Sequence, residues 1–235
     1  MKTNLLRTVL GVASTLLISA ALPTLGRSQE TPPVTTPAEP EATAEAEPIQ
    51  PAVTATIINP TTPKELELMR VGETAIDLLA VSMVNEVKVA LSLGAPEQAV
   101  DMCHLKTLAS NGGTVSRVPR VSGAKLTSLK TRASESAPDA ADKLALEYVE
   151  VAMKAGNNVP KVIVQRLDKP DSPPEWRVYK PIGVNANCLI CHGNPADQTP
   201  NLRIKLKAYY PNDKATGYTE REWRGLIRVN VAENP

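Results

Sequence analysis

The chain has 235 residues, with 26 Lys and Arg against 25 Asp and Glu, and a formal net charge of +1. This balance argues against nucleic acid or an anionic membrane surface as a partner, because both select basic proteins. The length is that of one domain with additional segments. Phe is absent and aromatic residues make up 3% of the chain, so we expect a core of aliphatic side chains.

Residues 1–28 are typical of a secretory signal peptide. Lys2 and Arg7 give a positive start, residues 8–22 are mostly apolar, and Ser19 and Ala21 are small enough for a cleavage site. The apolar run is short for a membrane span, and an uncleaved N-terminal anchor is the alternative. We therefore expect an exported protein of the periplasm, with no stable membrane span unless this segment is retained.

Residues 29–63 are predicted to be a disordered linker. They contain eight prolines and five glutamates but no Lys or Arg. Such a segment buries too little apolar surface to offset the entropy lost on ordering. The folded domain is expected to occupy residues 64–235.

The first half of this domain is predicted to be helical. Pro63, with Thr61 or Thr62 as the cap, begins a long amphipathic helix that ends at Gly94. A second helix is expected over 96–109 and a third over 138–156. In the third helix Leu144, Tyr148 and Val151 share one face.

The second half favours strands. Residues 162–167 and 176–182 are rich in β-branched and aromatic residues, and the Pro-rich segment between them is typical of a hairpin loop. Residues 223–231 form a last strand with Ile227, Val229 and Val231 on one face, whereas residues 201–209 fit a strand or a short helix. Helices followed by strands predict an α+β domain with helices packed on an antiparallel sheet.

Cys188, Cys191 and His192 form a C-x-x-C-H sequence, the attachment motif of a c-type haem. The two thiols would each form a thioether with a haem vinyl group, and the imidazole would bind the iron as an axial ligand. The motif therefore predicts one haem c per chain.

The cysteine pair has three alternatives to haem attachment. A zinc site needs about four ligands, but the chain has three Cys and two His in two distant groups. A thioredoxin-like pair usually opens a helix directly after a strand, whereas this pair follows a polar loop. A structural disulfide is the third alternative. Haem attachment explains the whole motif best.

A basic segment, residues 114–133, is a candidate cradle for the haem propionates. It contains no acidic residue, and Arg and Lys pair well with carboxylates. Arg120, Lys130 and Arg132 are the candidate contacts. The alternative is an ordinary solvated basic loop.

Several segments resemble, in order, the PAS-like c-type haem family, a domain of unknown function in cyanobacteria and other bacteria. The resemblance covers roughly residues 64–232 and implies a PAS-like fold with one covalently bound haem. If the source is a cyanobacterium, the thylakoid lumen becomes an alternative location. The matching segments are residues 99–103, 127–132, 137–139, 188–192, 210–218 and 224–225.

Two neighbouring residues of the second predicted helix, Cys103 and His104, are candidates for the second axial ligand. From the residues alone His104 is attractive, because bis-imidazole haems are common. Cys103 is the thiol left over once Cys188 and Cys191 become thioethers, and a free thiol is a liability in an exported protein. The resemblance also implies a cysteine ligand at this position, so Cys103 is preferred, with His104, Met102 or an open site as alternatives.

These features predict a low-potential cytochrome for electron transfer or redox sensing with a separate, unknown partner protein. A haem-based gas or redox sensor that works with a partner is the alternative. Enzymatic activity is not expected, because the sequence contains no distal acid–base pair, glycine-rich phosphate loop or paired-carboxylate motif.

Overall fold

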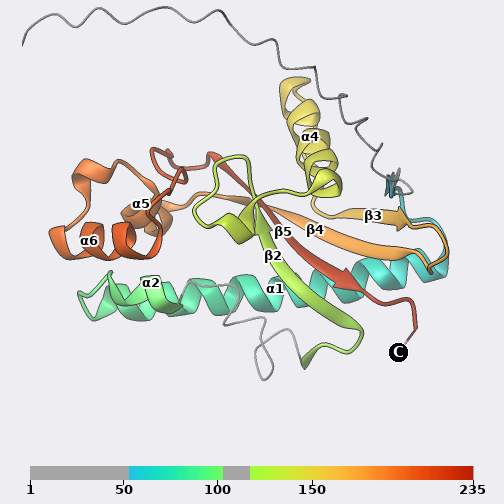
Figure 1. The fold of residues 1–235 in the computed structure, drawn as a ribbon, viewed down its shortest axis with the longest axis horizontal. Helices are drawn as coiled ribbons and strands as arrows, with labels where there is room; N and C mark the ends of the chain where they lie inside the picture. Colours follow the sequence, from blue (N-terminus) through green and yellow to red (C-terminus); the bar gives the residue numbers. More distant parts are fainter. Residues whose placement is uncertain (1–52, 103–116, 235) are drawn as a thin grey trace, which may run out of the picture. The chain divides into compact units, whose positions relative to one another are not determined.

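The structure, a computed structural model, describes residues 53–102 and 117–234. Within them a single antiparallel sheet is combined with helices (Figure 1), which confirms the α+β prediction. The main elements are β1 (Thr54–Ile58), α1 (Pro63–Ser92), α2 (Gln98–Met102), β2 (Val121–Thr127), α4 (Ala140–Lys154), β3 (Ile163–Asp168), β4 (Glu175–Gly183), α5 (Ala186–His192), α6 (Pro200–Tyr209) and β5 (Trp223–Val231). Two short 3-10 helices are Ser134–Ser136 and Pro195–Asp197.

The five strands are ordered β1-β3-β4-β5-β2, and every neighbouring pair is antiparallel. The β3–β4 pair is the predicted hairpin. β5 lies between β4 and β2, so the last strand in the sequence is an interior strand of the sheet. This order places the start of β5, at Trp223, beside the end of β4, at Gly183.

Helix α1 begins with the predicted cap. The Thr62 hydroxyl accepts a hydrogen bond from the Glu65 backbone, and the Glu65 carboxylate accepts one from the Thr62 backbone, which is a complete capping box. Gly72 brings α1 close to β4, because a methyl group at this position would overlap the side chain of Val178.

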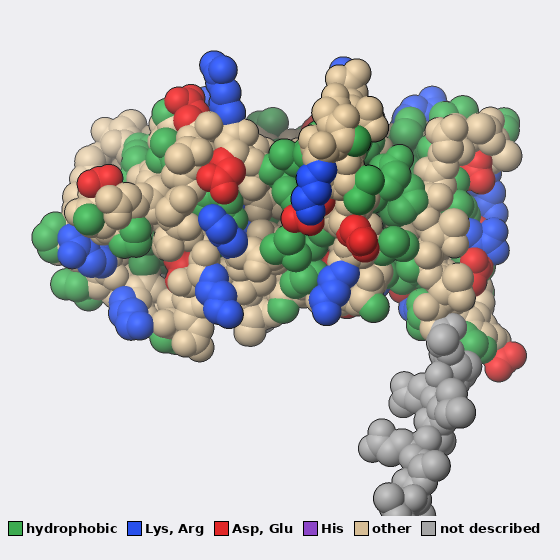
Figure 2. Space-filling model, turned by 90° about the horizontal axis from the view of Figure 1, so that it is seen from above, with side chains coloured by type: hydrophobic (Ala, Val, Ile, Leu, Met, Phe, Trp, Pro, Cys, Tyr) green, Lys and Arg blue, Asp and Glu red, His purple; other side chains and the backbone are tan. Residues whose placement is uncertain are grey.

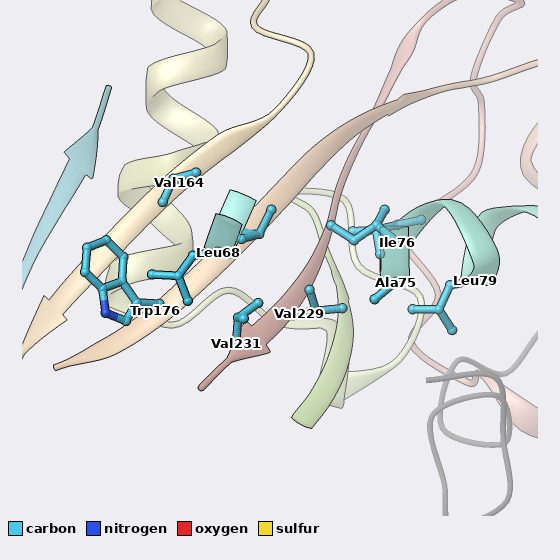
Figure 3. Close-up of a cluster of buried hydrophobic side chains, with 10 residues drawn as sticks. Leu68, Ala75, Ile76, Leu79, Val164, Trp176, Val229 and Val231 are labelled. Carbon is cyan, nitrogen blue, oxygen red and sulfur yellow. The ribbon is translucent and has the colours of Figure 1, made fainter. Parts of the chain in front are cut away.

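The larger core lies between α1 and one face of the sheet (Figure 3). Leu68, Ile76 and Leu79 of α1 are buried against strand residues. The predicted inward face of the last strand is confirmed. The strand members of this cluster are Val164, Trp176, Val178, Ile227, Val229 and Val231.

Helix α4 covers the other face of the sheet (Figure 1), where Leu146 and Val149 pack with Tyr179. Asp139 caps this helix, close to the predicted start. The face that Leu144, Tyr148 and Val151 share is not packed against the sheet, since these side chains are exposed by 36%, 46% and 58%. The buried residues instead include the small Ala141 and Ala145 and the charged Asp142, which a search for large apolar residues overlooks.

Two strands lie where the sequence favoured linker or loop. β1 falls inside residues 29–63, so ordered structure begins before the expected boundary at residue 64. β1 is stabilised by pairing with β3, and β2 by pairing with β5, which are tertiary contacts that local composition does not report. The ambiguous segment 201–209 belongs to a helix, α6, capped by Thr199.

No helix in the described ranges is long and apolar enough to cross a membrane. The face in Figure 2 carries Lys and Arg side chains at intervals, with Asp and Glu among them, rather than one continuous basic patch.

Candidate functional site

The C-x-x-C-H motif forms α5, a short helix just beyond the end of β4. Asn185 caps it by accepting hydrogen bonds from the backbone N–H groups of Asn187 (3.0 Å) and Cys188 (3.3 Å). Val184, which precedes the cap, exchanges backbone hydrogen bonds with Glu222 and Arg221 at the start of β5. The sheet therefore fixes the position from which the motif begins.

A cavity of about 400 Å³ lies beside α5, within the range of small-molecule and cofactor sites. Cys188, Cys191 and His192 all line it. Ten of the other 21 lining residues are aliphatic, and they come from elements far apart in the sequence. These aliphatic residues are Met83, Val84, Val87, Ala99, Val100, Ala124, Leu126, Ala133, Ile182 and Val184.

The imidazole of His192 is held through one ring nitrogen. Its Nδ1 lies 2.7 Å from the carbonyl oxygen of Ala215, and because a carbonyl can only accept, Nδ1 must carry the proton. The backbone of the same loop also holds the end of α5, since Tyr218 donates to the His192 carbonyl and Gly217 to the Gly193 carbonyl. Nε2 is thus the nitrogen left with a lone pair for a metal.

The environment of His192 strongly disfavours its charged form. Burial lowers its pKa to about 3, and the positive charges of Arg132 and Arg224 act in the same direction. The hydrogen bond to Ala215 opposes this shift but does not outweigh it. The ring is therefore neutral at physiological pH, which is the form that binds metals.

The two thiols are half-buried and are not joined by a disulfide. Burial raises the pKa of the Cys191 thiol, although the nearby Arg132 partly offsets this effect. In the described ranges no group of three or more His, Cys, Asp or Glu side chains is arranged to hold a metal ion. Within the described ranges the pair is therefore neither disulfide-bonded nor part of a zinc cluster.

Two arginines border the cavity near His192. Arg132 donates to the Asp213 carboxylate (2.9 Å) and to the Cys191 carbonyl (2.7 Å). Arg224 is buried, donates to the Lys130 carbonyl (3.2 Å) and has its guanidinium 5.4 Å from the ring centre of Tyr218. Among the residues that the structure describes, Arg224 has no carboxylate partner within ion-pair distance.

The structure brings one of the three predicted propionate contacts, Arg132, to the cavity. Arg120 does not line it. Its guanidinium instead binds the Glu67 carboxylate and the carbonyls of Ala232 and Glu233. Lys130 is also outside the lining, with its ammonium 4.5 Å from the ring centre of Tyr218 and 3.7 Å from Glu222. These two side chains already have other partners.

Three further cations line the cavity that were not selected as site residues: Lys125, Arg224 and Arg228. Arg224 and Arg228 belong to β5, an otherwise largely buried strand. A charged residue in such a strand needs a partner or a ligand, and this is the signal that could have identified them.

Cys103 and His104, the candidates for a second axial ligand, lie outside the described residues, and the side chain of Met102 is likewise not described. The described part of α2 does reach the site, because Ala99 and Val100 are buried and line the cavity. α6 closes the same region through Leu202 and Leu206, which pack with Val100 and Cys191.

Comparison with known proteins gives one solved structure and one family. The structure is titled as the crystal structure of the cyanobacterial heme-protein Tll0287; it is 22% identical, with a TM-score of 0.45, over 73% of this chain and 96% of that chain. No curated protein matches. The model of the Tll0287-like family matches residues 78–232, which include the C-x-x-C-H helix, the loop at 210–218 and β5. The chain therefore belongs to the Tll0287-like family.

Proposed function

We propose that the protein carries one haem c, attached through Cys188 and Cys191, with His192 as an axial iron ligand. The observation that carries this proposal is the imidazole geometry. Nδ1 is committed to the Ala215 carbonyl, while the ring lines a cavity next to both thiols. A metal-binding histidine commonly donates its second ring N–H to such an acceptor, which fixes the tautomer and the ring orientation.

The lining of the cavity fits a haem. Aliphatic side chains from α1, α2, β2 and β4 offer an apolar surface for the porphyrin, and cations offer partners for its carboxylates. The family relationship supports the same cofactor, since the related Tll0287 is described as a heme-protein.

We propose that Arg224 and Arg132 are the cations closest to the propionates. Arg224 is buried without a carboxylate partner in the described ranges, and such a charge is costly unless a ligand neutralises it. Arg132 has donors directed to Asp213 and Cys191 and lines the same cavity. This assignment replaces Arg120 and Lys130, which bind elsewhere.

For the opposite side of the haem we retain Cys103 as the preferred axial ligand, with His104 as the alternative. Cys103 is the thiol that remains once Cys188 and Cys191 form thioethers, and the resemblance to the PAS-like c-type haem family implies a cysteine ligand at this position. Ala99 and Val100 of α2, which precede both candidates in the chain, line the cavity.

The function that follows is one-electron exchange with a partner protein, in an exported location and without enzymatic turnover. When bound, the haem supplies a single iron that changes between the ferric and ferrous states. Two protein ligands leave no open position for substrate chemistry, and a thiolate ligand favours the ferric state and a low potential. A PAS-like arrangement and a role in redox sensing belong to the same proposal.

The test is production of the full chain together with the c-haem maturation machinery, followed by intact mass and a pyridine haemochrome spectrum. We expect a mass increase of one haem and the spectrum of two saturated thioether links. The variant with Cys188→Ser and Cys191→Ser should lose covalent haem, whereas Arg120→Gln should retain it. A wild-type mass equal to that of the bare polypeptide would overturn the proposal.

A further inference from the structure

Asp213 lies at the centre of the contacts that hold His192, although it touches neither the imidazole nor the thiols. One carboxylate oxygen, Oδ1, accepts from the backbone N–H of Ala215 at 2.8 Å, and the other, Oδ2, accepts from Nε of Arg132 at 2.9 Å. Its side chain is only 12% exposed. A single carboxylate therefore joins the loop that supplies the histidine's acceptor to a cation of the cavity.

The first contact fixes the backbone of the loop. Asp213 binds the N–H two residues further on, a local turn that restricts the chain just before the Ala215 carbonyl. That carbonyl is the acceptor for His192 Nδ1. Lys214 also donates to the carbonyl of Thr131, so the loop is tied to the segment that carries Arg132.

The second contact, between Asp213 and Arg132, connects the loop to the end of α5. Arg132 binds Asp213 with one guanidinium nitrogen and the Cys191 carbonyl with another. The residue before His192 and the acceptor of its ring are thus both held by the Arg132–Asp213 pair. Because Arg132 and Asp213 are only 14% and 12% exposed, solvent screens the pair weakly.

We propose that Asp213 is a positioning residue for the axial histidine. It holds the Ala215 carbonyl where it selects the Nδ1–H tautomer of His192, and its charge, balanced against Arg132, sets the reduction potential of the bound iron. The inference rests on the proposed haem function and adds a residue that controls the properties of that haem.

The main test compares the midpoint potentials of the haem-loaded wild type, Asp213→Asn and Asp213→Ala. Asn keeps an oxygen for the Ala215 N–H but removes the negative charge, so the charge of Arg132 is left unbalanced and the ferrous state is favoured. We expect the oxidised-to-reduced equilibrium to shift about tenfold, or ~59 mV upward for a one-electron couple. Asp213→Ala should also change the ferric EPR g-values, which report the orientation of the axial ligand.

The matched control is Glu175→Gln, which removes a carboxylate from another partly buried ion pair, 2.8 Å from Arg177. Neither of these residues lines the cavity. The control should leave the potential and the EPR spectrum at wild-type values. Equal potentials in wild type and Asp213→Asn, or equal shifts in Asp213→Asn and the control, would refute the role of Asp213.

A second measurement works without haem and therefore does not depend on the proposed function. The full chain with Cys188→Ser and Cys191→Ser contains only two histidines, so long-range proton–nitrogen NMR can assign the tautomer of His192. We expect the Nδ1–H form with Asp213 and a mixture with Asp213→Ala. An unchanged tautomer would contradict the positioning role even if haem attachment itself were demonstrated. This measurement also decides the matter if the Asp213 variants fail to retain haem.

Discussion

The guanidinium of Arg224 lies 5.4 Å from the ring centre of Tyr218, buried at the wall of the cavity and without a carboxylate partner in the described ranges. The Ser128 hydroxyl donates to the Arg224 carbonyl, which fixes the backbone as well. Burial also lowers the pKa of Arg224, against the favourable effect of Tyr218. The buried charge of Arg224 therefore carries a desolvation free energy that an anionic ligand would offset.

Substitution of Arg224 by Met should have opposite effects on the haem-free and haem-loaded proteins. In the haem-free protein an uncompensated buried charge is lost, so we expect the free energy of unfolding to rise by about 1 kcal/mol. In the haem-loaded protein the proposed propionate contact would be lost, so we expect stability to fall. Urea unfolding of both forms measures the change in the free energy of unfolding and its sign in each form. Destabilisation of the haem-free form would show that Arg224 is balanced by protein groups alone.

Gly72 is the closest approach of α1 to the sheet, and its replacement by Ala should destabilise the fold. The new methyl group would overlap Val178, and overpacking of this kind costs about 1–3 kcal/mol. Val178→Gly alone removes buried surface, but in combination with Gly72→Ala it also removes the Cβ and both γ-carbons that the new methyl group would meet. The double variant should therefore be more stable than the sum of the single changes predicts, as thermal unfolding would show. Strict additivity would contradict the packing argument.

The ion pairs of Asp139 should make stability sensitive to acid. Burial alone would raise the pKa of Asp139, but the backbone N–H of Asp142 and the charges of Arg177 and Arg228 together hold it below its usual value. A carboxylate with a depressed folded-state pKa stabilises the protein above its unfolded pKa of about 3.9, and this stability is lost as pH falls through the folded pKa.

Asp139→Asn keeps the helix cap of α4 but removes the charge. We expect it to be less stable than wild type at pH 7, with the difference shrinking as the pH falls below 4. Urea unfolding across this range is the measurement, with the exposed Glu147→Gln as control. A difference that stays constant with pH would assign the effect to the cap.

The axial ligand opposite His192 can be identified from two neighbouring substitutions. Cys103→Ser should abolish the low-spin thiolate features of the ferric spectrum, whereas His104→Ala should leave the spectrum unchanged. If only the His104 change alters the optical and EPR spectra, the thiolate assignment is wrong.

Rapid and complete binding of CO by the reduced wild type would favour gas sensing over electron transfer.

The parts of the fold that local patterns specify were predictable. α1, α4, β3, β4 and β5 lie close to the ranges expected from periodicity, caps and punctuating prolines. β1 and β2 were not, because short strands with few large apolar residues depend on the neighbours they pair with. In α4 the residues Leu144, Tyr148 and Val151 share a face as expected, but this face is exposed. Ala141, Asp142 and Ala145 are buried instead by their tertiary contacts, which a periodicity of large apolar residues does not encode.

The grouping of the three motif residues was predictable, but their surroundings were not. Cys188, Cys191 and His192 lie on one short helix and line the same cavity, as their close spacing indicates. The contribution of Ala215 could not be read from the sequence, since a backbone carbonyl has no residue preference. Basic composition selected Arg120 and Lys130, yet a cation's location depends on which carboxylates and carbonyls fold nearest to it.

The two thiols pack into different hydrophobic clusters. Cys188 contacts the cluster of Val184, Ala215 and Tyr218, whereas Cys191 contacts the cluster formed by α2 and α6. If haem is attached as proposed, its two thioether links would connect these two clusters through one porphyrin. Haem attachment would then stabilise the packing of α2 and α6 as well as that of the 210–218 loop.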